Sequence, residues 1–132
     1  MKQIASARVD STDVHYRHDI RTGAHTLVAD EPAHAGGGDT GPAPYELLLA
    51  SLGACTAITL RMYAEKKGWD LGRLGVDLQL LKNREGEPRI ERQLTASAAL
   101  DEAQWARLLE IAEKTPVTLT LKGGAPIVTR RG

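Results

Sequence analysis

The stretch PYELLLASLGACTAITLRMYAEKKG, residues 44–68, decides the fold of this chain. Its first residue is a proline, which the first turn of a helix accepts, and Gly68 follows two lysines at the other end. These signals predict a helix from about Pro44 to Lys67. No residue between Leu47 and Leu60 is charged, and a helix that is apolar all round must be enclosed on all sides. The sequence therefore predicts a long, buried central helix.

One small sheet can cover only one side of such a helix. Small residues in its middle would let another backbone come close: Ala50, Ser51, Gly53 and Ala54. We therefore expect a second subunit to cover the other face, which makes the protein an obligate homodimer. The alternative is that a second helix of the same chain covers that face.

The segments before and after this helix predict an α+β fold. Apolar and polar residues alternate over residues 3–30, which is typical of an antiparallel meander, with its third strand at about Ala24–Ala29. Glycine and proline dominate residues 31–44, which predicts a long loop. Two further strands, one around residues 76–80 and one at Ile90–Ala98, form a predicted hairpin.

A second helix is expected after the hairpin. Asp101 and Gln104 have capping-box spacing, and Pro116 ends the helix at Thr115. By propensity alone, the following residues 117–121 read as a strand, and Ile127–Thr129 as a C-terminal strand. A length of 132 residues fits a single domain, residues 1–132.

Composition excludes several classes of function. Lysine plus arginine and aspartate plus glutamate balance at 17 each, so no net field favours nucleic acid or an anionic membrane. The N-terminus has no apolar targeting segment, and the uncharged run Leu47–Leu60 is shorter than the roughly 20 residues of a bilayer span. These features predict a cytoplasmic protein. The four histidines and one cysteine lack metal-ligand spacing, so we expect neither a metal nor another cofactor.

Cys55 is the one cysteine, so it cannot form an intramolecular disulfide. Its helical neighbours are mostly apolar, and such surroundings disfavour a thiolate. A buried, inert cysteine, a reactive thiol and an intersubunit disulfide therefore all stay open on the residues alone. A reactive thiol needs a nearby cation; Arg17 and Arg21 are candidates, whereas Arg61 points to a different helix face.

Three segments together resemble a known family. They are GGGDTGPAPYELLLASLGACTAITLRMYAEKKG at residues 36–68, HTLVADEP at residues 25–32 and LLEIAEKTPV at residues 108–117. They are similar, in this order, to the OsmC/Ohr family of thiol-dependent hydroperoxide reductases. The resemblance implies an intertwined homodimer with a thiol site at the subunit interface. It also implies that residues 117–121 are helical rather than a strand.

The resemblance further implies roles for individual residues. Cys55 matches the cysteine that attacks the peroxide, and the resolving cysteine of the family falls on Thr115, which cannot form a disulfide. Tyr45 stands where the peroxidase motif has a carboxylate, and Glu46 follows it. Tyr45 is a candidate donor to the leaving oxygen, and Glu46 a candidate anchor for an arginine, for which Arg17 and Arg21 remain tentative choices.

These features predict a one-cysteine peroxidase that reduces organic hydroperoxides in oxidative stress defence. Because no internal partner exists for Cys55, an external thiol or another molecule must resolve its oxidised form. An apolar pocket would favour a small hydrophobic hydroperoxide. The alternatives are a non-catalytic dimer that binds a small apolar ligand, and a purely structural or regulatory dimer.

Overall fold

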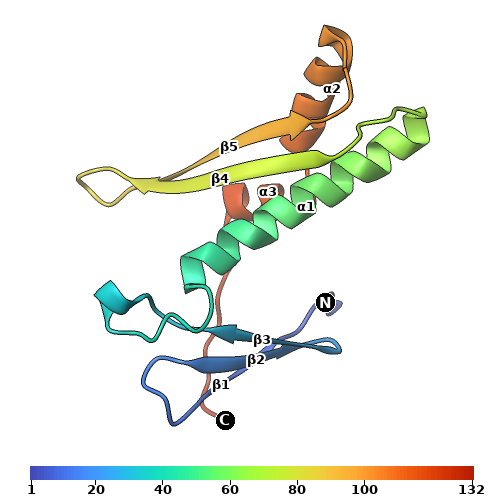
Figure 1. Cartoon of the computed structure of the whole chain (residues 1–132). Coiled ribbons are helices and arrows are strands. Elements are labelled where there is room, and N and C mark those ends of the chain that lie inside the picture. The colour runs from blue at the N-terminus through green and yellow to red at the C-terminus, as the bar shows by residue number, and fades with distance from the viewer. The chain divides into compact units, whose positions relative to one another are not determined.

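The predicted α+β fold is confirmed by a computed structural model, which describes all residues 1–132 (Figure 1). Contacts along the chain divide it into two compact units, residues 1–48 and residues 49–132. The elements in chain order are β1 (Arg8–Ser11), β2 (His18–Thr22), β3 (His25–Ala29), a short 3-10 helix η1 (Ala33–Ala35), α1 (Pro44–Lys67), β4 (Leu74–Lys82), β5 (Pro88–Ala96), α2 (Glu102–Ala112) and α3 (Pro116–Gly123).

The first unit contains the predicted antiparallel meander, in the order β1-β2-β3. Ile20 on the central strand lies opposite Val9 and Leu27 and is the buried apolar residue of this sheet. The alternation over residues 3–30 also predicted a second strand that includes Val14 and Tyr16, which is wrong, because β2 begins only at His18. The Thr12 side chain accepts a hydrogen bond from the Val14 N–H at 3.1 Å and so stabilises a turn there.

The glycine-rich loop after β3 is organised by a buried carboxylate. Asp30, which is 2% exposed, accepts hydrogen bonds from the Thr40 hydroxyl at 2.5 Å and the Thr40 N–H at 3.1 Å. The Glu31 N–H donates to the same carboxylate at 2.7 Å. These bonds, the Thr40 hydroxyl foremost, lower the pKa of Asp30 from 3.8 to about 2. The loop therefore has a defined shape, including the short helix η1, although its composition predicted none.

The second unit is built on the predicted β4–β5 hairpin. Strand β4 extends two residues beyond the predicted residues 76–80 at each end, whereas β5 starts and ends two residues earlier than predicted. Helix α1 packs against β4 at Gly53, where an added Cβ would lie only 2.8 Å from Leu78 Cδ1. An alanine at this position would therefore require the end of the Leu78 side chain to shift. Four fully or almost fully buried residues form the core between α1 and α2: Leu60, Ala64, Leu71 and Leu108.

Helix α1 has the predicted bounds, but the other elements of the second unit do not enclose it. Leu52, Gly53, Thr56, Leu60 and Ala64 are buried along one face. The opposite face carries an exposed, uncharged stripe at helical spacing, made of Ser51, Ala54, Ile58 and Met62. Neither α2 nor α3 covers this stripe, so the alternative of cover by the chain's own second helix is wrong.

Helix α1 is 24 residues long with a mean hydropathy of 1.5 in its most apolar stretch. By length and composition alone it meets the requirements of a membrane-crossing helix, as the core helix of a soluble protein also can. The uncharged run Leu47–Leu60 is shorter than this helix, which also includes charged residues near its two ends.

The C-terminal elements correct two strand predictions. The capping box of α2 is present, with the Gln104 N–H donating to Asp101 at 2.7 Å. Pro116 begins α3, so the helix implied by the family resemblance is confirmed and the strand suggested by propensity is wrong. The C-terminal strand predicted at Ile127–Thr129 is also wrong: residues 124–132 form no strand, and Ile127 is 90% exposed.

Candidate thiol site

Cys55 lies on α1 in the second unit, where it is partly buried. The backbone N–H of Val117 donates to its Sγ across 3.5 Å. Val117 is the second residue of α3, so the sulfur faces the N-terminal turn of a helix. The free N–H groups and the positive end of the helix dipole favour negative charge there. This contact supplies what the apolar neighbours on α1 do not, a hydrogen-bond donor directed at the sulfur.

A buried guanidinium lies next to this contact. Arg92 on β5 has a side chain that is only 12% exposed. Its Nη1 donates to the hydroxyls of Thr56, at 2.8 Å, and Thr118, at 2.9 Å. Its Nη2 donates to the backbone carbonyl of Ala112 at 3.0 Å and to Glu113 at 3.2 Å. All four N–H groups of the two Nη atoms are therefore satisfied, as a buried charge requires.

The counter-charge for Arg92 is shared with a lysine. Glu113 accepts a hydrogen bond from Lys122 at 2.6 Å as well as from Arg92. Lys122, followed by Arg92, keeps the pKa of Glu113 below its usual value, against the opposing effect of burial. Glu113 therefore stays ionised and holds the guanidinium and the last turn of α3 together.

Thr115 caps the start of α3 and is fully buried. Its hydroxyl lies 2.6 Å from the hydroxyl of Thr118 and 3.4 Å from the carbonyl oxygen of Ala112. Both of these groups also bind Arg92. The residue at the expected resolving position is thus part of the Arg92 network, on the helix that contacts Cys55.

Comparison with known proteins identifies the family. A sequence model described as OsmC-like protein matches residues 36–130. The chain belongs to the OsmC-like protein family. No curated protein sequence matches the chain.

Solved OsmC-like structures share its fold. An OsmC-like protein from Mycoplasma pneumoniae has a TM-score of 0.73 at 16% identity, over 93% of this chain and 90% of that one. The organic hydroperoxide resistance protein OsmC from Legionella pneumophila has a TM-score of 0.67 at 19% identity, over 92% and 90%. The organic hydroperoxide resistance protein OhrB of Bacillus subtilis has a TM-score of 0.62 at 22% identity, over 92% of both chains.

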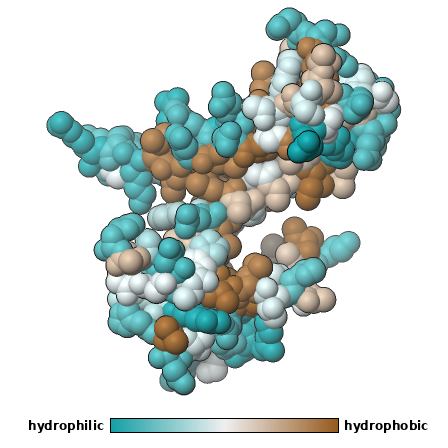
Figure 2. Space-filling view, in the orientation of Figure 1, coloured by the Kyte–Doolittle hydropathy of each residue, from teal (hydrophilic) through white to brown (hydrophobic).

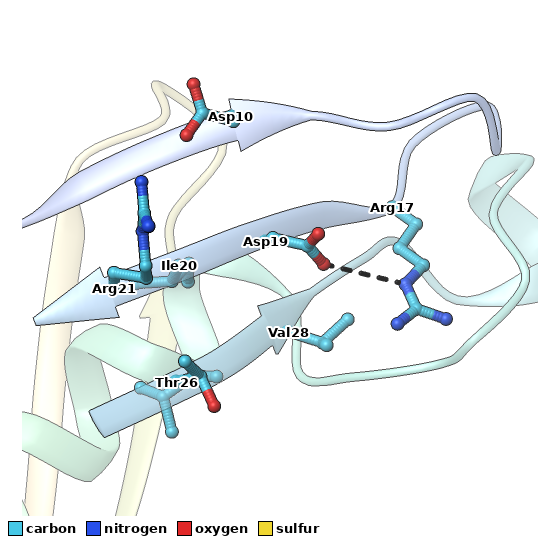
Figure 3. Close-up of a pocket in the computed structure, with 8 residues that line it drawn as sticks. Asp10, Arg17, Asp19, Ile20, Arg21, Thr26 and Val28 are labelled. Atoms are coloured by element: carbon cyan, nitrogen blue, oxygen red, sulfur yellow. Dashed lines mark ion pairs between the residues drawn. The ribbon is translucent and has the colours of Figure 1, made fainter. Parts of the chain in front are cut away.

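In this OsmC-like chain, the two arginines proposed from the sequence lie in the first unit. Arg17 and Arg21 line an open pocket of about 610 Å³ beside the sheet, together with Asp10 and Asp19 (Figure 3). Arg17 Nε is 3.9 Å from Asp19 Oδ1, the outer limit of an ion pair. The negative charges of the two aspartates therefore balance the positive charges of the two arginines in this pocket. The role of either arginine toward Cys55 stays a prediction.

Tyr45 and Glu46 lie in the first turn of α1, also in the first unit. The carboxylate of Glu46 accepts a hydrogen bond from the Ala43 N–H at 2.9 Å, which caps the start of the helix. Tyr45 is 56% exposed. Their proposed roles as donor and anchor stay predictions as well.

Sequence reasoning missed Arg92, although the strand pattern contained the signal. In β5, Ile90, Arg92 and Leu94 alternate with exposed residues and so share the covered face. A charged residue at an inward position of a strand is rarely fully buried without a partner. The position of Arg92 in the strand pattern therefore implies a hydrogen-bond or charge partner. The contact from Val117 could not have been found in this way, because it depends on how α3 packs against α1.

Proposed function

We propose that this OsmC-like protein is a one-cysteine thiol peroxidase that reduces organic hydroperoxides. The observation that carries the proposal is the Val117 N–H directed at Cys55 Sγ from the start of α3. The names of the Legionella pneumophila and Bacillus subtilis relatives, both organic hydroperoxide resistance proteins, support the choice of substrate class.

In the proposed reaction, the Cys55 thiolate attacks the outer oxygen of a hydroperoxide ROOH. The S–O bond forms as the O–O bond breaks, and the leaving alkoxide takes up a proton to give the alcohol ROH. The sulfur is oxidised by two electrons to a sulfenic acid, and the peroxide is reduced. The Val117 N–H at the start of α3 supports the proposal because it can donate to the negative sulfur of the attacking thiolate.

Resolution requires a thiol from outside the chain, because Thr115 stands at the expected resolving position. An external thiol attacks the sulfenic acid, releases water and leaves a mixed disulfide on Cys55. A second thiol then attacks this disulfide and regenerates the Cys55 thiol, with the two external thiols joined as a disulfide.

The test is rapid mixing of the reduced protein with cumene hydroperoxide, followed by trapping of the sulfenic acid with dimedone. We expect Cys55 to be oxidised much faster than free cysteine and to carry one dimedone adduct. Cys55→Ser is the control and should give no adduct. An oxidation rate no faster than that of free cysteine would refute the proposal.

The replacement of the second cysteine by Thr115 favours a second candidate, a non-catalytic dimer that binds a small apolar ligand. Under this function, Cys55→Ser keeps full ligand affinity and no peroxide turnover occurs in the unmodified protein. Binding of an unreactive alcohol analogue, such as cumyl alcohol, to both variants separates the two functions.

We further propose a cytoplasmic homodimer as the working form. The exposed stripe Ser51, Ala54, Ile58 and Met62 supports a second copy at α1, since an uncharged helix face is rarely left in water. Figure 2 shows further apolar surface along the hairpin and α1. Burial of this stripe would also narrow access to Cys55, which lies beside Ala54 on the same helix.

A further inference from the structure

Arg92 bonds to the chain neighbours of both groups that form the thiol contact. Thr56, which it holds at 2.8 Å, directly follows Cys55 on α1. Thr118, which it holds at 2.9 Å, directly follows Val117 on α3. One nitrogen atom therefore fixes the distance between the helix turn that carries the sulfur and the turn that carries the N–H group.

The same guanidinium also fixes where α3 begins. Its other nitrogen donates to the carbonyl of Ala112, the last residue of α2, and to Glu113 just beyond it. The rigid, planar fork of an arginine suits this task, because one residue meets four acceptors with a set geometry. A lysine at the same place has a single nitrogen atom, which could not reach the acceptors of both Nη1 and Nη2.

We infer that Arg92 is a positioning residue for Cys55, which holds the N-terminal turn of α3 against the sulfur by joining Thr56 to Thr118. It acts through these two hydroxyls and through the backbone of Ala112 rather than on the sulfur itself. Thr115 belongs to the same hydrogen-bond network, because its hydroxyl bonds to the Thr118 hydroxyl and to the carbonyl of Ala112. The position at which relatives are expected to carry a resolving cysteine thus serves here to order α3.

This inference deepens the proposed function, and its test does not use peroxide. The measurement is the rate of alkylation of Cys55 by iodoacetamide as a function of pH, which reports the midpoint of thiol ionisation. Thr118→Val removes one hydroxyl with little change of shape and keeps the charge of Arg92. We expect its midpoint to move upward by roughly 0.5 pH unit, the size of a helix N-terminus effect.

Four further variants sharpen the test. Thr118→Ser keeps the hydroxyl and should retain the original midpoint. Arg92→Met and Arg92→Lys should both raise the midpoint, because neither side chain can join the two threonines. Arg89→Met removes an exposed arginine from the same strand and should change nothing.

If Thr118→Val leaves the midpoint unchanged while Arg92→Met raises it, or if Arg92→Lys restores it, Arg92 acts by charge alone and the positioning role is refuted. Unchanged midpoints in all folded variants refute it too. A shifted midpoint in a protein that fails to reduce cumene hydroperoxide would support the positioning role and reject only the peroxidase.

Discussion

Truncation of the exposed stripe on α1 should break the proposed dimer while leaving the fold intact. Ile58 and Met62 are 55% and 58% exposed in the single chain, so about half of each side chain remains for a partner to cover. Full burial of such a side chain contributes about 1.5–3 kcal/mol, so the remaining half contributes about 1 kcal/mol. Two residues on each of two copies give about 4 kcal/mol, or roughly a thousandfold in the dissociation constant.

The assay is sedimentation velocity over a wide concentration series. We expect the unmodified protein to be dimeric, and the double variant Ile58→Ala, Met62→Ala to dissociate at concentrations near a thousandfold higher. Leu109→Ala is the matched control, because Leu109 is 53% exposed on α2, away from the stripe. A monomeric unmodified protein at every concentration, or a double variant as tightly dimeric as the parent, would refute the reasoning.

Three further predictions follow from single contacts. Leu60→Ala should lower the protein's free energy of unfolding, measured with urea, by about 3 kcal/mol, because Leu60 is fully buried between α1 and α2. A loss as small as that caused by truncating an exposed leucine would contradict the packing described. The pKa of Asp30 is depressed, so the stability it contributes is present above pH 3.8 and is lost as the pH falls toward about 2. As the pH is lowered across this range, the urea midpoint of unfolding should fall for the parent and change less for Asp30→Asn. Parallel plots of midpoint against pH for the two proteins would show that the Asp30 carboxylate does not contribute to stability. Thr115→Cys should form a disulfide with Cys55 after one equivalent of peroxide, seen as a mass loss of two hydrogens. If this variant is folded and reacts with peroxide but both cysteines stay unlinked, the alignment of the resolving cysteine with Thr115 is refuted.

The sequence predicted those elements whose signals are local. Helix α1 was predicted with its observed bounds, because proline, glycine and the terminal lysines mark its ends. The capping box of α2 was likewise recognisable from two residues. The start of β2 was missed since its alternation continued backward through a turn, where the Thr12 hydroxyl competes with strand pairing.

Predictions that require a partner element were less successful. Residues 117–121 are β-branched and apolar enough for a strand, yet a helix begins there, with Thr115 at the N-cap position and Pro116 at the first helical position. Ile127 and Val128 have strand propensity, but propensity describes a side chain that fits a pleated and half-covered surface. Ile127 and Val128 are instead 90% and 84% exposed and belong to no strand.

The candidate thiol site illustrates why the sequence alone left Cys55 undecided. Its neighbours along α1 argued for an inert cysteine, because helical spacing reveals only the residues of the same helix. The group that favours a thiolate comes from α3, 62 residues later, and the cation that orders it comes from β5. Arg92 was nevertheless visible as a charge on the covered face of a strand. A buried charge costs several kcal/mol unless it is satisfied, so its presence implies a set of acceptors even before their identity is known. In this chain two of those acceptors, Thr56 and Thr118, directly follow Cys55 and Val117, which makes the inward arginine of β5 a better guide to the candidate thiol site than the residues surrounding the cysteine itself.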